Sequence, residues 1–285
     1  MAKIKLVASD IDGTIIDKAN NISEKNFVAI KKIKAKNIPF TICTGKSYSV
    51  SKNVCEQFDA DFGVFGNGTQ IVDLKTGKEL VKWILTQEDL LFVVTMAKRY
   101  NYHVHIYTAN DIVTEELKYM DLRNYKIAKE SHNDTLNFIV VPDIIKYIED
   151  NVPEVYSVVI TTEETTLLEF MTLLTINDRM ICTFINKRGK YRDEVIDKDY
   201  EYLNITPTNI NKNEALTFLS KYLNISKNNM LAIGDNLNDV EMVKYAGIGV
   251  AVNEAYNELK DVATYVTNST TSEGAFAEAI DKYIK

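Results

Sequence analysis

Short apolar segments alternate with helical patterns at both ends of this 285-residue chain, and that alternation limits the folds open to it. Residues 3–10 (KIKLVASD) predict a buried strand, and residues 23–37 (SEKNFVAIKKIKAKN) predict a helix with Ser23 as its N-cap. Strands and helices that alternate in this way form a parallel sheet with helices on its faces. We therefore predict an α/β fold with a Rossmann-like, doubly wound parallel-sheet core.

The alternation continues along both ends of the chain. After the first helix, the pattern predicts a strand, a helix and a strand that ends in a glycine-rich turn, at residues 38–45, 47–58 and 62–68. Near the C-terminus it predicts helices at residues 211–223 and 237–247, the second ended by Gly247, with strands at 229–235 and 248–252. Further helices are expected at residues 255–263 and 274–284.

The middle of the chain has a different pattern of predicted helices and strands. A helix is expected from Thr86, which with Asp89 forms a capping-box pattern. The segments that follow are rich in β-formers and are separated by helical patterns. We predict an inserted α+β domain at residues 84–200, between the two parts of the core, residues 1–83 and 201–285.

Polar clusters occur where three of the predicted core strands end. They are SDIDGT at residues 9–14, TGKS at 44–47 and GDNLND at 234–239. Since parallel strands place their C-terminal ends at one edge of a sheet, these clusters should meet there. A turn at a strand end explains any one of them, because Asp and Gly are common in turns, but not all three. The residues expected to converge are Asp10, Asp12, Thr44, Asp235, Asn238 and Asp239.

Such a cluster suits phosphoryl transfer. Carboxylates crowded into one cleft repel each other unless a cation neutralises them, and an all-oxygen site of this kind suits Mg²⁺. Thr44 and the amide of Gly45 can donate hydrogen bonds to phosphoryl oxygens, and Lys212 can add positive charge. A phosphoryl group would then be held between Mg²⁺ and Lys212.

The spacing of Asp10 and Asp12 gives that pair a role in catalysis. A separation of two residues places both side chains on the same side of an extended segment, and Gly13 lets the chain turn sharply after them. One carboxylate can attack phosphorus and form an aspartyl-phosphate. The other can protonate the leaving oxygen and then activate water.

These motifs resemble those of the haloacid dehalogenase (HAD) superfamily of phosphatases, specifically the Cof-like group with a large α/β cap of the C2 (IIB) type. The first motif of that family appears as DIDGT, and the second as Thr44 in TICTGK. The third appears as Lys212 in NINKNEAL and the fourth as GDNLND. The GNG turn at Asn67 and the segment ATYVTNSTTSEG are also similar to the group.

The resemblance implies a role for each motif residue. Asp10 would be the nucleophile and Asp12 the general acid and base. Mg²⁺ would be held by Asp10, the backbone carbonyl of Asp12, and Asp235. The strand before Asp10 would be central, flanked by the strands before Asp235 and Thr44, and the cap would close over the site. Phosphoryl contacts are expected from Thr44, Gly45, Lys212 and Asn238, with Asp239 and Asn67 in support.

Two positions depart from the family pattern. Lys46 stands where the family usually has arginine, and lysine offers a point charge without the paired donors of a guanidinium group. We expect Lys46 to contribute to substrate binding. The segment AVNEA around Asn253 replaces a pattern that is often Met-Gly-Asn-Ala in the group, which we interpret as a minor loop change.

Composition limits the classes of molecule that this chain is expected to bind. The net charge is −7 and there is no long basic tract, so neither nucleic acid nor an anionic membrane surface is expected to bind. No segment reaches the ~20 apolar residues that span a bilayer, and the apolar run before Asp10 is too short for a signal peptide. We expect a cytoplasmic enzyme that acts on a small phosphorylated metabolite. Its three cysteines form no CxxC pair and are expected to be buried thiols.

The leading hypothesis is a Mg²⁺-dependent phosphatase that acts on small phosphorylated metabolites, with the preference for sugar phosphates implied by the resemblance alone. One alternative is a phosphotransferase or sugar phosphomutase of the same superfamily. The compact GDNLND motif argues against it, since eukaryotic phosphomannomutases have a longer fourth motif. Another is a sugar-phosphate sensor without turnover, which the intact set of Asp10, Asp12 and Lys212 argues against. The lack of membrane spans excludes an ion-pumping ATPase.

Overall fold

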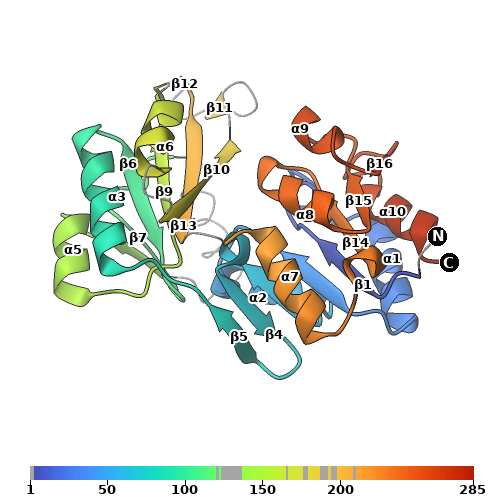
Figure 1. Ribbon diagram of the computed structural model, residues 1–285. Coiled ribbons are helices and arrows are strands. Elements are labelled where there is room, and N and C mark those ends of the chain that lie inside the picture. Colours follow the sequence, from blue (N-terminus) through green and yellow to red (C-terminus); the bar gives the residue numbers. More distant parts are fainter. Residues whose placement is uncertain are drawn as a thin grey trace. The chain divides into compact units, whose positions relative to one another are not determined.

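The structure is a computed structural model that describes residues 3–119, 122, 137–164, 166–175, 179–186, 192–193, 198–207 and 210–285. The chain divides into two compact units (Figure 1). The first unit consists of Met1–Gly45, Val54–Lys82 and Asn211–Lys285. The second unit consists of Lys46–Asn53 and Trp83–Ile210. Among the described helices, none is long and apolar enough to cross a membrane.

The first unit is built on an eight-stranded sheet with the order β16-β15-β14-β1-β2-β3-β4-β5. Neighbouring strands are parallel from β16 to β3, and β4 and β5 form an antiparallel hairpin at the edge. The predicted doubly wound parallel sheet is therefore confirmed. Its strands are β1 (Leu6–Ser9), β2 (Phe40–Cys43), β3 (Phe62–Phe65), β4 (Gln70–Asp73), β5 (Lys78–Lys82), β14 (Met230–Gly234), β15 (Ile248–Ala251) and β16 (Tyr265–Val266).

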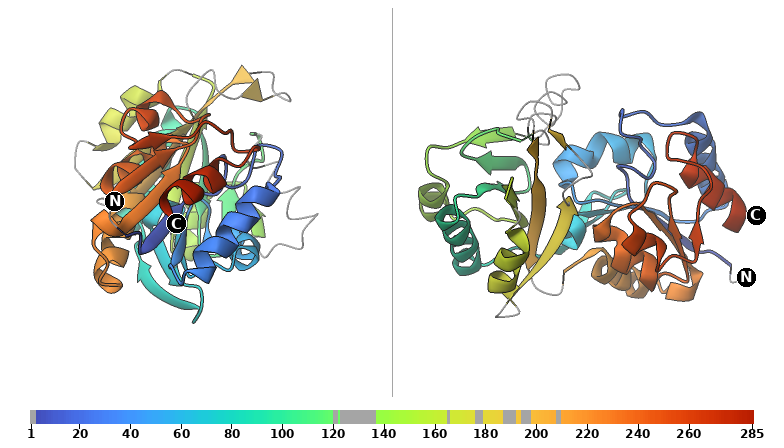
Figure 2. Two further views of the ribbon diagram at one scale, coloured as in Figure 1. Left: turned by 90° about the vertical axis from the view of Figure 1, so that its right-hand side faces the viewer. Right: turned by 90° about the horizontal axis from the view of Figure 1, so that it is seen from above.

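Helices cover both faces of this sheet. Helix α1 lies beside α10 on one face, and α7 lies beside α8 on the other (Figure 2). Strands β1 and β14 are buried along their whole length, because their apolar residues face helices on both sides. The helical segments of the first unit are α1 (Glu24–Ala35), η1 (Gly66–Gly68), α7 (Lys212–Tyr222), η2 (Lys227–Asn229), η3 (Leu237–Asp239), α8 (Val240–Tyr245), α9 (Asn257–Lys260) and α10 (Ala275–Tyr283). Helix α2 (Tyr48–Gln57) has residues in both units.

Gly247 lies just past the helix that it is predicted to end, after the C-cap residue Ala246. Helix α8 ends at Tyr245, and Gly247 does not have a positive φ. Glycine is required there for space, because a Cβ at this position would lie 2.5 Å from Cα of Asn228.

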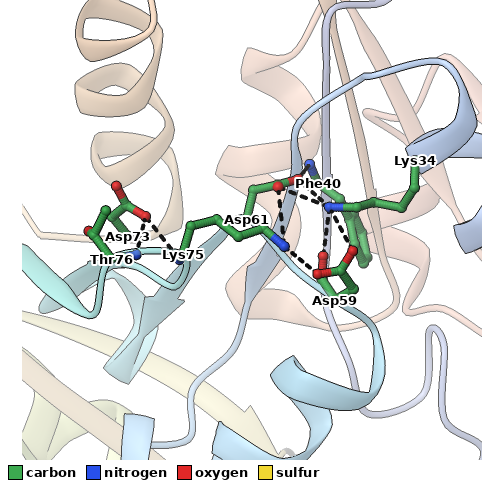
Figure 3. A network of polar contacts seen from close by, with 7 residues as sticks. All are labelled: Lys34, Phe40, Asp59, Asp61, Asp73, Lys75 and Thr76. Carbon is green, nitrogen blue, oxygen red and sulfur yellow. Dashed lines mark hydrogen bonds and ion pairs between the residues drawn. The ribbon is translucent and has the colours of Figure 1, made fainter.

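An ionic network joins several elements of the first unit at the end of the sheet where β2 and β3 begin (Figure 3). Lys34 of α1 places its Nζ 2.9 Å from Oδ1 of Asp61, just before β3. The other oxygen of Asp61 accepts a 2.8 Å hydrogen bond from the amide of Phe40, the first residue of β2. Lys75, in the β4–β5 turn, pairs with Asp59. These contacts fix α1, β2, β3 and the hairpin relative to one another.

The second unit contains a six-stranded sheet with the order β10-β13-β9-β6-β7-β8. All its neighbouring strands are antiparallel except β7 and β8. The strands are β6 (His103–Tyr107), β7 (Asp111–Thr114), β8 (Asn137–Val140), β9 (Ser157–Thr162), β10 (Met180–Asn186) and β13 (Glu201–Pro207). A separate short pair is formed by β11 (Arg192–Asp193) and β12 (Lys198–Asp199).

Helices α3 (Gln87–Arg99), α5 (Ile144–Asn151) and α6 (Leu167–Thr175) pack their apolar residues against the second sheet. Thr86 caps α3 by accepting a hydrogen bond from the amide of Asp89, as its sequence pattern predicts. The domain boundary predicted at residue 200 is too early. Strand β13 pairs with β9 and β10, and its Leu203 and Ile205 belong to the core of the second unit.

Candidate active site

The predicted polar clusters follow three adjacent strands of the first unit. Asp10 follows β1, Thr44 follows β2 and Asp235 follows β14. In the parallel register, Ser9 of β1 is paired with both Ile42 of β2 and Ile233 of β14. The three polar side chains are therefore carried by strand ends at one edge of the sheet.

Lys212, the first residue of helix α7, links two of the carboxylates. Its Nζ lies 2.7 Å from Oδ1 of Asp10 and 2.6 Å from Oδ1 of Asp239. The lysine side chain has 0% exposure. Burial opposes its charge, but the two carboxylates outweigh burial and raise the pKa of Lys212. Lys212 is therefore a fixed positive charge within the site.

Negative charge is in excess around that lysine. The ligand oxygens of Asp10, Asp235 and Asp239 all lie within 4.8 Å of one another. Burial raises the pKa of Asp10 well above its usual range; Lys212 counteracts this, while Asp239, Asp235 and Asp12 add to it. A cation close to Asp10 would relieve this crowding.

The donor set fits a hard divalent cation, because every ligand atom is a carboxylate oxygen. Asp239 is already engaged on both oxygens. Its Oδ1 meets Lys212, and its Oδ2 accepts from the amides of Asp235, at 3.1 Å, and Asn236, at 3.0 Å. Asp10 and Asp235 are therefore the carboxylates best suited to hold a metal, while Asp239 fixes Lys212.

The turn after the aspartate pair is as sharp as the sequence predicts. Gly13 has a φ of +84°, and a Cβ there would lie 2.4 Å from Oδ2 of Asp235. Thr14, buried beside it, donates to Oδ1 of Asp235 at 3.4 Å. Asp10 is buried whereas Asp12 is exposed. The DIDGT segment thus supplies one buried carboxylate, one exposed carboxylate and a turn that packs closely against Asp235.

The remaining predicted residues of the first unit form a polar chain. The backbone N–H of Asn67 donates to the backbone carbonyl of Thr44 at 3.0 Å. Nδ2 of Asn238 donates to Oδ1 of Asn67 at 2.7 Å. A Cβ on Gly45 would lie 3.2 Å from the side-chain amide of Asn67, which leaves little room for a larger residue. Lys46 belongs to the second unit.

Sequence reasoning missed two contacts. The first is the hydrogen bond from Thr14 to Asp235. Thr14 lies within the DIDGT motif, so its position in the motif could have indicated a role for it. The contact between Asn67 and Asn238 joins residues 171 positions apart, and no local pattern signals it.

Comparison with known proteins decides the family. The family model of haloacid dehalogenase-like hydrolases matches residues 7–280. The chain belongs to the haloacid dehalogenase-like hydrolases. A Bacillus subtilis 5-amino-6-(5-phospho-D-ribitylamino)uracil phosphatase is 27% identical over 295 residues, covering 99% of this chain and 96% of the relative.

Solved structures of this family share the fold. A haloacid dehalogenase-like hydrolase from B. subtilis has a TM-score of 0.81 at 22% identity, covering 99% of this chain and all of that one. A sugar phosphatase of HAD subclass IIB has a TM-score of 0.74 at 17% identity, covering 98% of each chain. The predicted place among the phosphatases of this superfamily is confirmed, and the chain is an enzyme of that group.

Proposed function

We propose that this phosphatase is Mg²⁺-dependent and hydrolyses small phosphorylated metabolites, with sugar phosphates as the expected class, through an aspartyl-phosphate on Asp10. The main observation behind this proposal is the buried Lys212, whose Nζ lies 2.7 Å from Oδ1 of Asp10 and 2.6 Å from Oδ1 of Asp239. Asp235 belongs to the same cluster of carboxylates. The substrate class is supported by two similar proteins, a phosphatase named for a phosphoribityl substrate and a sugar phosphatase.

Asp10 is the proposed nucleophile. Lys212 holds its Oδ1, so the carboxylate keeps a fixed direction and Oδ2 is the oxygen that attacks. The new bond joins Oδ2 to phosphorus, while the bond from phosphorus to the leaving oxygen breaks. A nucleophile fixed by a buried partner loses little conformational entropy on reaching the transition state.

Asp12 is the proposed general acid and base. Its exposed carboxyl can exchange protons with solvent, unlike the buried carboxyl of Asp10. In the first step it gives a proton to the leaving oxygen. In the second it takes a proton from the water that attacks phosphorus, which releases phosphate and restores Asp10.

The phosphoryl charge needs several partners. Asp10, the backbone carbonyl of Asp12, and Asp235 would hold Mg²⁺, which when bound neutralises charge on the phosphoryl oxygens. Asp239 keeps the ammonium of Lys212 in place. The proposed phosphoryl or substrate contacts are Thr44, Gly45, Lys46, Lys212 and Asn238, with donors aimed at acceptor oxygens.

The test is phosphate release from a panel of sugar phosphates, nucleotides and an aryl phosphate, with Mg²⁺ and with chelator. Asp10→Asn keeps the size of the side chain and removes the nucleophile. Asp281→Asn, an exposed position on helix α10, is the matched control.

Release that requires Mg²⁺, is lost in Asp10→Asn and is unchanged in Asp281→Asn supports the proposal. No release from any compound by the folded wild type would overturn it in favour of a transferase or a sensor. Release that persists in Asp10→Asn would overturn the assigned nucleophile.

A further inference from the structure

The segment that leads into helix α10 contacts the turn of the DIDGT motif. This segment, residues 267–274, runs from strand β16 to α10. Oγ1 of its Thr271 donates a hydrogen bond to the backbone carbonyl of Gly13, 258 positions away in the sequence. Thr271 is 4% exposed, so water has little access to its hydroxyl. The C-terminal segment therefore supplies a buried donor to the turn that follows Asp10 and Asp12.

That carbonyl belongs to the part of the turn that packs against Asp235. Gly13 has a φ of +84°, and a Cβ there would lie 2.4 Å from Oδ2 of Asp235. Thr14, on the other side of the same peptide bond, donates to Oδ1 of Asp235 at 3.4 Å. Glycine has more backbone freedom than any other residue, so a contact from outside the turn limits the orientations that this peptide can adopt. The hydroxyl of Thr271 provides that contact.

The AVNEA segment around Asn253 holds Thr271 and its neighbours in turn. Oε2 of Glu254 accepts a 3.0 Å hydrogen bond from the backbone N–H of Thr271. Nδ2 of Asn253 donates to the backbone carbonyls of Thr267 and Asn268, both at 3.2 Å. The departure from the family pattern in this segment is therefore more than a minor loop change, because its side chains fix residues 267–271.

The chain just after the AVNEA segment contacts the backbone of Asp235. The N–H of Tyr256 donates to the carbonyl of Asp235 at 3.1 Å. A closed ring of contacts results. It runs from the Asp235 backbone through the AVNEA segment and Thr271 to Gly13, which packs against the Asp235 carboxylate. This ring fixes the carboxylate of Asp235 relative to the DIDGT turn.

We propose that Thr271 is a positioning residue for the metal site, whose hydroxyl fixes the Gly13 carbonyl and so keeps the DIDGT turn and Asp235 at the spacing that Mg²⁺ requires. This inference rests on the proposed function, in which Asp235 and the DIDGT segment hold Mg²⁺. Thr271 acts through Gly13 and contacts neither the metal nor the substrate. Residues that orient metal ligands in this way commonly contribute about 10–100-fold to metal affinity or activity.

The size of the bound ion separates positioning from a general effect on stability. Mg²⁺ requires near-octahedral ligands at about 2.0–2.1 Å, whereas Ca²⁺ accepts ligands at about 2.3–2.6 Å in a more variable geometry. A loosened DIDGT turn should therefore weaken the binding of Mg²⁺ more than that of Ca²⁺. A variant that is only less stable would keep the wild-type preference between the two ions while it is folded.

The first test is isothermal titration calorimetry of Mg²⁺ and Ca²⁺ with the metal-free wild type, Thr271→Val and Thr271→Ser. The exchange to valine keeps the size of the side chain and removes the donor, whereas serine keeps a hydroxyl. Thr271→Val should raise the dissociation constant of Mg²⁺ by ~10-fold and that of Ca²⁺ by a smaller factor. Thr271→Ser should bind both ions as the wild type does. At saturating Mg²⁺, kcat and KM of Thr271→Val for phosphate release should approach the wild-type values.

Thr41→Val is the matched control. Thr41 lies in strand β2 of the same unit and is fully buried. Its Oγ1 has no hydrogen-bond partner among the residues that the structure describes. The same exchange there removes a buried hydroxyl without breaking such a contact, so both dissociation constants should be unchanged.

Glu254 decides the question if Thr271→Val does not fold, because Glu254 is exposed and its exchange leaves the core intact. Glu254→Ala removes the acceptor for the N–H of Thr271 and should raise the dissociation constant of Mg²⁺ by ~3-fold. Glu254→Gln keeps an acceptor oxygen and should bind Mg²⁺ more tightly than Glu254→Ala, which separates the hydrogen bond from the loss of a negative charge. Equal Mg²⁺ affinity in the wild type and Glu254→Ala, or in the two variants, would count against the ring of contacts.

The outcomes separate this inference from the proposed function. Unchanged Mg²⁺ affinity in Thr271→Val, or an equal loss for Mg²⁺ and Ca²⁺, would overturn the role of Thr271 while the proposed phosphatase still stood. A wild type that binds Mg²⁺ but releases no phosphate would overturn the proposed function, and the same titrations would still decide the role of Thr271. A folded wild type that binds no Mg²⁺ would overturn both.

Discussion

Lys212 keeps its charge with no exposed side-chain surface because Asp10 and Asp239 both contact its ammonium group. Neither carboxylate can be removed without consequence, since a buried charge that loses its partner costs about 3–5 kcal/mol. The same arrangement explains why Asp10 is a better candidate than Asp12 for the nucleophile. Asp10 is fixed by a buried partner, whereas Asp12 is exposed.

Asp12→Asn should lower kcat by ~10²–10⁴ while leaving KM nearly unchanged, because proton transfer contributes in the transition state and not to binding. The loss should be smaller for an aryl phosphate with an acidic leaving group, which departs without help. Steady-state kinetics with an alkyl and an aryl phosphate measure the difference. Equal losses of kcat/KM for the two substrates, a ratio that reports the first step only, would contradict the role of Asp12 as general acid.

Gly13→Ala should displace Asp235, because the added Cβ would lie 2.4 Å from its Oδ2 and Gly13 has a φ of +84°. We expect the Mg²⁺ concentration for half-maximal activity to rise by ~10-fold or more, as metal ligands lose their geometry. Gly77→Ala is a suitable control, since Gly77 also has a positive φ, of 71°, but has nothing within 4 Å of its Cβ position. An unchanged Mg²⁺ requirement in Gly13→Ala would count against Asp235 as a ligand.

At the scale of elements, local chemistry made most of the fold predictable. Ser23 caps α1 and Thr86 caps α3, as their sequence patterns indicate. Strand β16, which has only Tyr265 and Val266, carries no periodicity and was not predicted. The second-unit strand β13 was placed in the wrong domain, because pairing partners that are distant in sequence leave no local signal.

Glu278 joins helix α10 to the segment of β16. Burial disfavours its charge, but hydrogen bonds from the Tyr265 hydroxyl and from Asn268 and Ser269 outweigh burial and lower the pKa of Glu278 to about 2. A folded-state pKa below the ordinary value stabilises the fold above pH ~4.5, and this contribution is lost as pH falls toward 2.

Glu278→Gln should therefore lower the free energy of unfolding by about 1–2 kcal/mol at pH 7, a range reduced for solvent screening of a half-buried group. At pH 2.5 the difference from wild type should shrink. Urea unfolding at the two pH values measures it, with the exposed Glu149→Gln as control. A difference independent of pH would mean that the carboxylate's charge is not what joins these elements.

At the scale of the whole molecule, the candidate site could be predicted because its chemistry sits at strand ends. Asp10, Thr44 and Asp235 follow adjacent parallel strands, so topology alone places them at one edge. The pairing of Asn67 with Asn238 depends on side-chain positions in three dimensions, which strand and helix patterns do not encode.

Mg²⁺ should stabilise the folded enzyme, because the Asp10 and Asp235 carboxylates lie together only in the folded state. Binding at 100 times the dissociation constant adds about 2.7 kcal/mol to the free energy of unfolding. Differential scanning calorimetry should show Tm rising with Mg²⁺ and falling with chelator. Asp235→Asn should lose the Mg²⁺ effect. An equal rise with NaCl of matched ionic strength would show screening of surface charge instead.

The central claim is that Asp10 carries the phosphoryl group. The most direct measurement is rapid mixing of enzyme, Mg²⁺ and substrate, acid quenching within one turnover, and mass spectrometry of the peptide that contains Asp10. We expect that peptide to gain the mass of one phosphoryl group in the wild type and not in Asp10→Asn. Phosphate release that proceeds with no labelled peptide, and continues in Asp10→Asn, would contradict the account.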